Sequence, residues 1–146
     1  MPENLTVTLR PVDEGDLEAF FQHQLDAEAC AMAAFPPRDD DAFYSHWHKI
    51  LAGDGTERTI EASGEVAGYV VSWCQDGHRE VGYWLGKSYW GRGIASAALR
   101  RFTAEISERP LLAWVAEHNV GSIRVLEKAG FVRDGRDGHH LIFKLD

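Results

Sequence analysis

Trp90-Gly91-Arg92-Gly93-Ile94-Ala95 lies between a segment typical of a strand, residues 80–85, and a segment typical of a helix. Two glycines one residue apart allow the backbone to approach a ligand without interference from a Cβ atom. The first N–H groups of a helix have no partner within it, and the helix dipole favours an anion at that end. Arg92 adds a positive charge beside them. The stretch therefore predicts a loop that binds a pyrophosphate.

Three other kinds of glycine loop share part of this pattern. Gly86-Lys87-Ser88 matches the end of a Walker A loop, but the leading glycine of that motif would fall on Val81. A dinucleotide-binding fingerprint needs glycine or alanine three residues after Gly93, where the chain has Ser96. A plain glycine turn that caps the helix stays open as an alternative, although a cap alone would not need two glycines together with an arginine.

Apolar periodicity and turn residues predict the order β-α-α-β-β-β-α-β-α-β-β along the chain. Seven strands are expected at residues 5–9, 58–62, 66–74, 80–85, 111–116, 131–132 and 141–143, and four helices at residues 16–25, 39–52, 94–106 and 120–129. The third helix implies a crossover that places two parallel strands in the middle of a mixed sheet. The chain is thus expected to form one α+β domain over residues 1–146, with its ligand site at the carboxyl ends of the central strands.

The composition is that of a globular protein with an acidic surface. Hydrophobic residues make up 45% of the chain and charged residues 26%, and the net charge is −8. An acidic chain is a poor match for nucleic acid and favours cationic partners such as amines. No apolar run approaches the roughly 20 residues of a membrane span, and Met1-Pro2-Glu3-Asn4 lacks the features of a secretory signal. These observations predict a cytoplasmic protein without nucleic-acid or membrane partners.

The cysteine and histidine residues show no spacing typical of metal ligands. Cys30 and Cys74 lie in apolar stretches and are expected to be two buried thiols, with one disulfide as the alternative. His46 and His48 are two residues apart in a predicted helix, so they do not share a face. No metal site is therefore expected.

Four segments carry a resemblance that covers nearly the whole chain. They are Leu9-Arg10-Pro11 before an acidic helix start, residues 80–85, residues 89–95 and residues 118–131. In this order and spacing they resemble the GNAT family of acetyltransferases, and within it the branch typified by the ribosomal-protein N-acetyltransferases RimJ and RimL. One departure is Trp90, which stands where the general family pattern Q/R-x-x-G-x-G/A has glutamine or arginine.

The resemblance implies a GNAT fold and an enzyme that moves an acetyl group from acetyl-CoA directly to a primary amine. That amine would belong to a small molecule or to a protein N-terminus, and a homodimer is one assembly that the resemblance allows. Many members carry a general-acid tyrosine immediately before a Glu-Lys pair, and this chain has Leu126 there. The alternative function is therefore a catalytically silent domain that binds acyl-CoA.

The resemblance also implies which residues hold the coenzyme. The backbone of a strand end would pair with the thioester and pantetheine, the glycine loop would hold the pyrophosphate, and two sites on the last helix would contact the pantetheine arm and the adenosine 3′-phosphate. In that order the residues are Trp84, Leu85 and Gly86; Trp90, Gly91, Arg92, Gly93, Ile94 and Ala95; Asn119 and Ser122; and Lys128. Asn119 also suits a helix N-cap, and Lys128 also suits a solvated charge near a helix C-terminus.

Catalytic and acceptor-binding roles rest on fewer residues. Ser122 replaces the missing tyrosine as the implied general acid, although a serine in a first helical turn also has a plain capping interpretation. Glu80 is the candidate base, acting through water, with a surface glutamate near a turn as the alternative. Phe35, Phe43 and Trp47 fall where the family lines its acceptor pocket, and the last two also fit the core-facing stripe of a helix.

Overall fold

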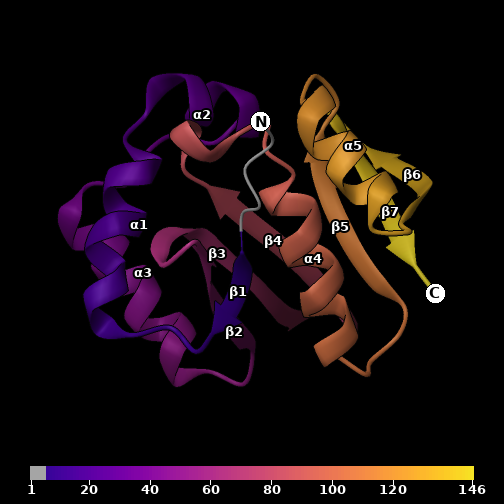
Figure 1. The fold of residues 1–146 in the computed structure, drawn as a ribbon. Coiled ribbons are helices and arrows are strands. Elements are labelled where there is room, and N and C mark those ends of the chain that lie inside the picture. The colour runs from indigo at the N-terminus through magenta and orange to yellow at the C-terminus, as the bar shows by residue number, and fades with distance from the viewer. Residues whose placement is uncertain (1–5) are drawn as a thin grey trace.

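The computed structural model describes residues 6–146; residues 1–5, which include Leu5 of the first predicted strand and the Met1–Asn4 start, lie outside this description. Seven strands and five α-helices follow one another along the described chain, with two 3-10 turns, η1 (Glu14–Asp16) and η2 (Lys87–Tyr89) (Figure 1). The strands are β1 (Val7–Arg10), β2 (Thr56–Ala62), β3 (Glu65–Gln75), β4 (His78–Leu85), β5 (Leu111–Ala116), β6 (Val132–Asp137) and β7 (His140–Leu145). The α-helices are α1 (Leu17–Gln24), α2 (Ala27–Ala33), α3 (Asp40–Ala52), α4 (Ile94–Glu105) and α5 (Val120–Lys128).

The strands form one sheet in the order β1-β2-β3-β4-β5-β7-β6. Its one parallel pair is β4 with β5, joined through α4, and the remaining neighbours in residues 6–146 are antiparallel. The predicted α+β class and the mixed seven-stranded sheet are therefore confirmed. Within this part of the chain, no helix has the length and apolar character needed to cross a bilayer.

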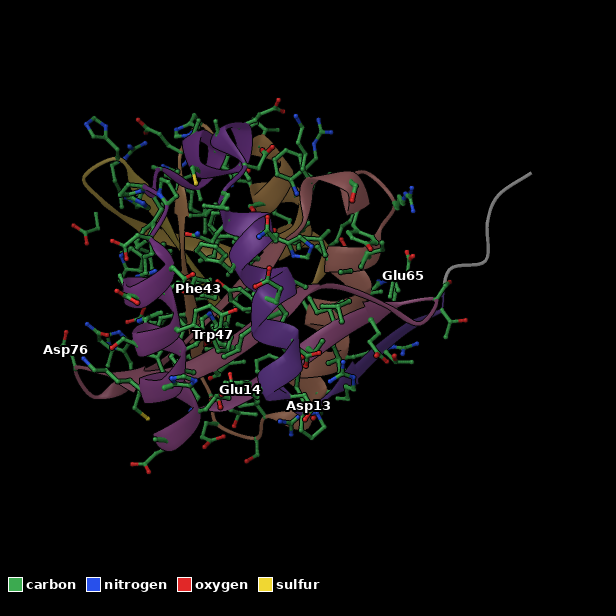
Figure 2. The ribbon with its side chains drawn as sticks, turned by 90° about the vertical axis from the view of Figure 1, so that its left-hand side faces the viewer. Asp13, Glu14, Phe43, Trp47, Glu65 and Asp76 are labelled. Atoms are coloured by element: carbon green, nitrogen blue, oxygen red, sulfur yellow. The ribbon has the colours of Figure 1, made fainter. Side chains whose placement is uncertain are left out.

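Helices cover both faces of the sheet, and each face has its own apolar cluster. On one face α4 and α5 pack on the strands around Leu99, Phe102 and Val70. On the other face α1 and α3 surround Phe20 and Trp47, which meet the neighbouring strand residues of β3 (Figure 2). Successive side chains of a strand point to opposite faces, so the central strands contribute to both clusters. The sheet is thus the middle layer of three.

The predicted count of four helices was wrong, because the structure contains α2. This helix has only seven residues, most of them small, so it carries no apolar stripe of the length that periodicity can detect. Its start is set by Asp26, whose side chain accepts a hydrogen bond from the N–H of Ala29 at 2.8 Å. Its end is set by Ala34, which adopts the left-handed conformation with φ 55°.

Two further expectations are corrected at the end of the chain and at a hairpin. The last two strands, β6 and β7, extend over six residues each and turn at Gly138, so most of the loop expected at 135–138 is strand. Of β6, only the start at residues 131–132 was predicted, because the rest of this edge strand is charged and has no apolar alternation. Cys74 is exposed near the β3–β4 turn, whereas Cys30 is buried as expected, and both thiols are free.

A buried carboxylate ties the beginning of the chain to the sheet. Asp16 accepts two hydrogen bonds from the Arg10 guanidinium, at 2.7 and 2.8 Å, and one each from Thr59 Oγ1 at 2.7 Å and the N–H of Asp13 at 2.8 Å. Burial acts to raise the pKa of Asp16, but the hydrogen bonds from Arg10, Asp13 and Thr59 outweigh it, and the pKa lies below the usual value. This cluster joins β1, β2 and η1, and so orients the path into α1.

Replacing this carboxylate tests how much the cluster stabilises the fold. Asp16→Asn is expected to lower the free energy of unfolding by about 2–3 kcal/mol, since hydrogen bonds to a charged group are lost. The folded pKa of Asp16 is lowered, so its contribution is present above about pH 4 and is lost as the pH falls through the folded value. Urea unfolding of both proteins at neutral pH and at pH 3 measures the difference. Asp54→Asn, an exposed carboxylate, is the control, and an equal loss in both variants would contradict the prediction.

Candidate functional site

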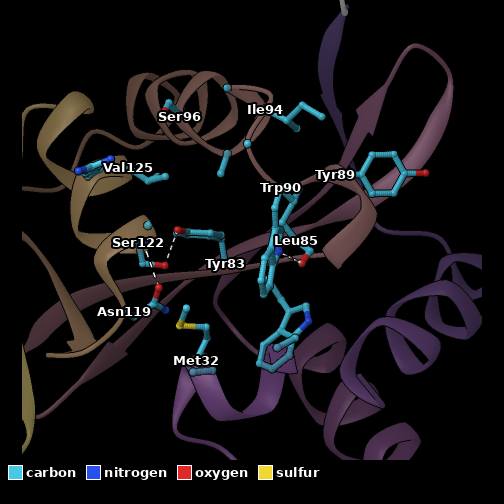
Figure 3. Close-up of a pocket in the computed structure, with 18 of the residues that line it drawn as sticks. Met32, Tyr83, Leu85, Tyr89, Trp90, Ile94, Ser96, Asn119, Ser122 and Val125 are labelled. Carbon is cyan, nitrogen blue, oxygen red and sulfur yellow. Dashed lines mark hydrogen bonds between the residues drawn. The ribbon is translucent and has the colours of Figure 1, made fainter. Parts of the chain in front are cut away.

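The candidate site lies where β4 and β5 part. The two strands pair only at Arg79 with Leu111 and at Glu80 with Leu112. Beyond that point β4 continues along β3 to Leu85, while β5 continues along β7 to the end of the strand. A cavity of about 360 Å³ occupies the gap, with walls from α2, β4, the loop after it, α4 and α5 (Figure 3). It lies at the carboxyl ends of the parallel strands, as expected for a ligand site in such a sheet.

The loop between β4 and α4 forms one wall of the cavity through its glycines. Gly91 and Gly93 adopt positive φ angles of 76° and 77°, a conformation that side chains other than glycine disfavour. A Cβ added at either glycine would meet no described atom within 4 Å, so the space beside them is open to a ligand. The first bond that closes α4 runs from the N–H of Ala97 to the carbonyl of Gly93, which leaves the N–H groups before it at the helix start. The arrangement suits a pyrophosphate.

The edge of β4 that faces the gap presents backbone groups of alternate residues. The N–H of Gly86 donates to the carbonyl of Ala67 at 2.8 Å, on the β3 side. The carbonyl of Leu85 accepts from the indole N–H of Trp90 at 2.9 Å, on the open side. Since backbone groups alternate along a strand, those of Tyr83 and Leu85 face the gap. Of the predicted backbone contacts at 84–86, the geometry therefore favours Leu85, and Trp84 is also among the residues that line the cavity.

Tyr83 brings a phenol to the polar wall of the cavity. Its hydroxyl lies 2.6 Å from Ser122 Oγ, and the backbone N–H of Ser122 donates to the side chain of Asn119 at 3.2 Å (Figure 3). Asn119 is the N-cap of α5, as predicted. Burial raises the pKa of Tyr83 above its ordinary value, and the hydrogen bond with Ser122 opposes that rise. Tyr83 was not among the residues predicted from the sequence, although its place in the segment 80–85, one residue before Trp84, was the available signal.

Two exposed cations of α5 line the cavity beside the glycine loop. Arg124 and Lys128 are four residues apart, so they lie one above the other on the same face of the helix. Arg124 was not predicted, because a single arginine inside a helix motif does not reveal which face it occupies. Arg92 is exposed in the loop and does not line the cavity. A phosphate-bearing ligand would therefore meet Arg124 and Lys128 across from the start of α4.

The remaining predicted residues lie outside the cavity wall. Glu80 is the last residue of β4 that pairs with β5, and one of its carboxylate oxygens lies 3.1 Å from His78 Nε2. Phe43 and Trp47 are packed in the cluster beneath α3, with 3% and 1% of their surface exposed. Phe35 follows α2 and is 45% exposed, with the Arg38 guanidinium over its ring. The cavity thus gathers the glycine loop, Leu85 and the start of α5, but not these four.

Comparison with known proteins agrees with this geometry. A family model described as an acetyltransferase (GNAT) domain matches residues 6–132, and the chain belongs to this family. The probable N-acetyltransferase YjcK of Bacillus subtilis is 41% identical over 59 residues, which is 38% of this chain and 33% of that protein. The chain spans about a third of the length of the curated relatives it matches.

Solved structures share the whole fold. The aminoglycoside acetyltransferase AAC(6')-Ib in complex with coenzyme A superposes with a TM-score of 0.79 at 22% identity, over 95% of this chain and 93% of that one. The spermidine N-acetyltransferase of Vibrio cholerae, in complex with CoA and spermine, superposes with a TM-score of 0.78 at 17% identity, over 94% and 92% of the two chains. At these identities the likeness establishes the fold.

The hydrogen bond between Tyr83 and Ser122 has a measurable consequence. Ser122→Ala removes the partner that opposes the effect of burial, so the pKa of Tyr83 is expected to rise further. NMR titration of the protein labelled at tyrosine Cζ, with the Tyr83 signal assigned through Tyr83→Phe, measures the change. Ser88→Ala alters an exposed serine and serves as the control. An unchanged or lower pKa in Ser122→Ala would show that the two hydroxyls do not interact.

Proposed function

We propose that this chain is an acetyl-CoA-dependent N-acetyltransferase that transfers an acetyl group directly to a primary amine. The observation that carries the proposal is the open glycine loop at the start of α4, continuous with the gap between β4 and β5. A pyrophosphate at the loop and an extended chain along Leu85 would together match the two ends of one coenzyme A molecule. Family membership and the two structural neighbours in complex with CoA support the same ligand.

The walls formed by β4, the glycine loop, α4 and α5 would each hold one part of the coenzyme. The glycine loop and the first N–H groups of α4 would bind the pyrophosphate, and Arg124 with Lys128 would neutralise phosphate charge from the α5 side. The N–H of Leu85 would donate to a carbonyl of the pantetheine arm or thioester, as a strand edge donates to a neighbouring strand. Glu80 remains the predicted base. Since it lies outside the cavity, it would act through a water molecule.

We assign the general acid to Tyr83, with Ser122 as the residue that positions it. In the reaction the amine nitrogen bonds to the acetyl carbon and gives up a proton through water to the proposed base Glu80, the carbon–sulfur bond breaks, and the departing sulfur takes up a proton from the acid. A tyrosine phenol is protonated at neutral pH at its ordinary pKa of about 10, and burial raises the pKa of Tyr83 further, so the proton is present to be donated to the departing sulfur. This differs from the sequence-based prediction, in which Ser122 itself was the acid. The phenol in the cavity also favours a catalytic domain over a silent acyl-CoA-binding one.

Three parts of the sequence-based prediction remain proposals. They are the RimJ/RimL-like branch, the cytoplasmic location and the homodimer. The single-domain organisation over residues 1–146 likewise stays a prediction. The acceptor is a primary amine in this proposal, and the neighbours that support it are named for aminoglycoside and spermidine acetylation.

Binding at the glycine loop can be separated from backbone strain by a matched pair of variants. Gly93 and Gly64 both have positive φ, 77° and 85°, and both have open space where a Cβ would lie. Gly93→Ala and Gly64→Ala should therefore cost similar stability, about 1–2 kcal/mol. Only Gly93→Ala places a methyl group in the proposed phosphate site, and it should weaken CoA binding by about tenfold or more, or 1.4 kcal/mol. Calorimetric titration with CoA measures this, and equal affinities in the two variants would overturn the site.

The role of Tyr83 is tested by the kinetics of two variants. Tyr83→Phe should lower kcat by about 10²-fold or more with little change in KM for acetyl-CoA, since only proton donation is lost. Ser122→Ala should have a smaller effect and should move the basic limb of the pH–rate profile upward, because the acid then loses its proton at higher pH. If Ser122→Ala is the more damaging variant and leaves the basic limb in place, Ser122 and not Tyr83 donates the proton.

A further inference from the structure

Helix α2 lies across the gap between β4 and β5, on the sheet face opposite α4 and α5. One contact reaches the β4 side, where Lys87 Nζ lies 2.9 Å from Glu28 Oε1. Another reaches the β5 side, where the ring nitrogen Nε2 of His118 lies 2.8 Å from the carbonyl oxygen of Ala31. Both contacts are exposed, so they orient the helix more than they stabilise it. Together they place α2 over the end of the gap between β4 and β5 (Figure 1).

The face of α2 that lines the cavity is apolar. Ala29, Met32 and Ala33 are spaced three and four residues apart on one face of α2, and all three line the cavity. Trp84 lines it from β4. Figure 3 shows Met32 on the α2 side of the cavity, across from Ile94 at the start of α4. The cavity therefore has an apolar end under α2 and a polar end at α4 and α5.

The charges in the cavity wall are of one sign. Among the described residues that line it, only Arg124 and Lys128 are charged, and none is a carboxylate. The chain as a whole carries a net charge of −8, so its excess of carboxylates lies elsewhere. A second ammonium group on a substrate would lose its hydration under α2 without gaining an anionic partner, which costs free energy. An aliphatic or aromatic group at the same place would be buried against apolar side chains.

We infer that the acceptor is a primary amine carried on an apolar group, and that this group packs against Ala29, Met32 and Ala33 of α2 and against Trp84 of β4. The inference rests on the proposed function. In that proposal the phosphate and pantetheine sites fill the α4 and α5 side of the gap. The amine then reaches the acetyl carbon from the α2 side, where its substituent contacts the apolar face of α2. A diamine or polyamine is a poor acceptor in such a site, although the acidic composition by itself favoured cationic partners.

Two amines of equal length and unequal charge test this inference on the unmodified protein. Hexylamine and cadaverine have the same number of heavy atoms, and cadaverine replaces the terminal methyl group by a second ammonium. Acetyl transfer, followed by thiol release from acetyl-CoA, is expected to favour hexylamine by about tenfold or more in kcat/KM. Cadaverine used as well as hexylamine, or better, overturns the inference while leaving the acetyltransferase function intact. Absence of transfer to both amines overturns the function together with the inference.

A pair of variants at one residue locates the preference. Met32→Glu adds a carboxylate to the cavity-lining face of α2. It should shift the ratio of the kcat/KM values for hexylamine and cadaverine toward cadaverine by about tenfold or more. Met32→Leu keeps an apolar side chain of similar volume and should retain the preference of the unmodified protein. A thermal shift with CoA should persist in both variants and confirms that they are folded. If the ratio is the same in Met32→Glu and Met32→Leu, the substituent does not lie under α2.

Discussion

The parting of β4 and β5 is the constraint on which the rest of the structure depends. A strand has two edges, and β4 keeps its pairing with β3 through Leu85 while β5 keeps its pairing with β7 through Ala116. The two strands cannot follow both of their outer partners and still meet each other beyond Glu80. The edge of β4 that this exposes must be satisfied by side chains or by a ligand. The indole of Trp90 satisfies one carbonyl, at Leu85, and leaves the remainder of the edge to the cavity.

Every other part of the site is placed relative to that gap. The chain that leaves β4 turns at two glycines and begins α4 beside it, and the chain that leaves β5 begins α5 on the same side. The two helix starts therefore face one cavity, with Asn119 capping one of them. On the opposite face α2 spans the same gap. A ligand in the gap would then have phosphate-binding groups at one end and an apolar wall at the other, and its chemistry would fall near Tyr83.

Much of the fold could be predicted from local patterns, because those patterns act over a few residues. The cap at Asn119, the start of α3 after Asp39 and the glycine loop all follow from side-chain and backbone preferences within one turn of chain. Helix α2 was not predicted because its seven residues, most of them small, are too few for an apolar period to be detected, and β6 was predicted only as residues 131–132 because the rest of this edge strand is charged. Cys74 was misplaced because an apolar stretch predicts burial only where the strand is covered.

The sequence by itself determined the glycine loop, the order of the seven strands and of four of the five α-helices in the described chain, and the family to which the chain belongs. These are properties of residues adjacent in the chain, where backbone conformation and hydrogen bonding are decided locally. Only the tertiary structure decided that Tyr83 meets Ser122, 39 residues later, and that α2 lies above the gap. Such contacts depend on which sheet face a side chain takes and on where two strands part. Both are decided when distant segments pack against one another, since the sheet pairing and the apolar faces must be satisfied together.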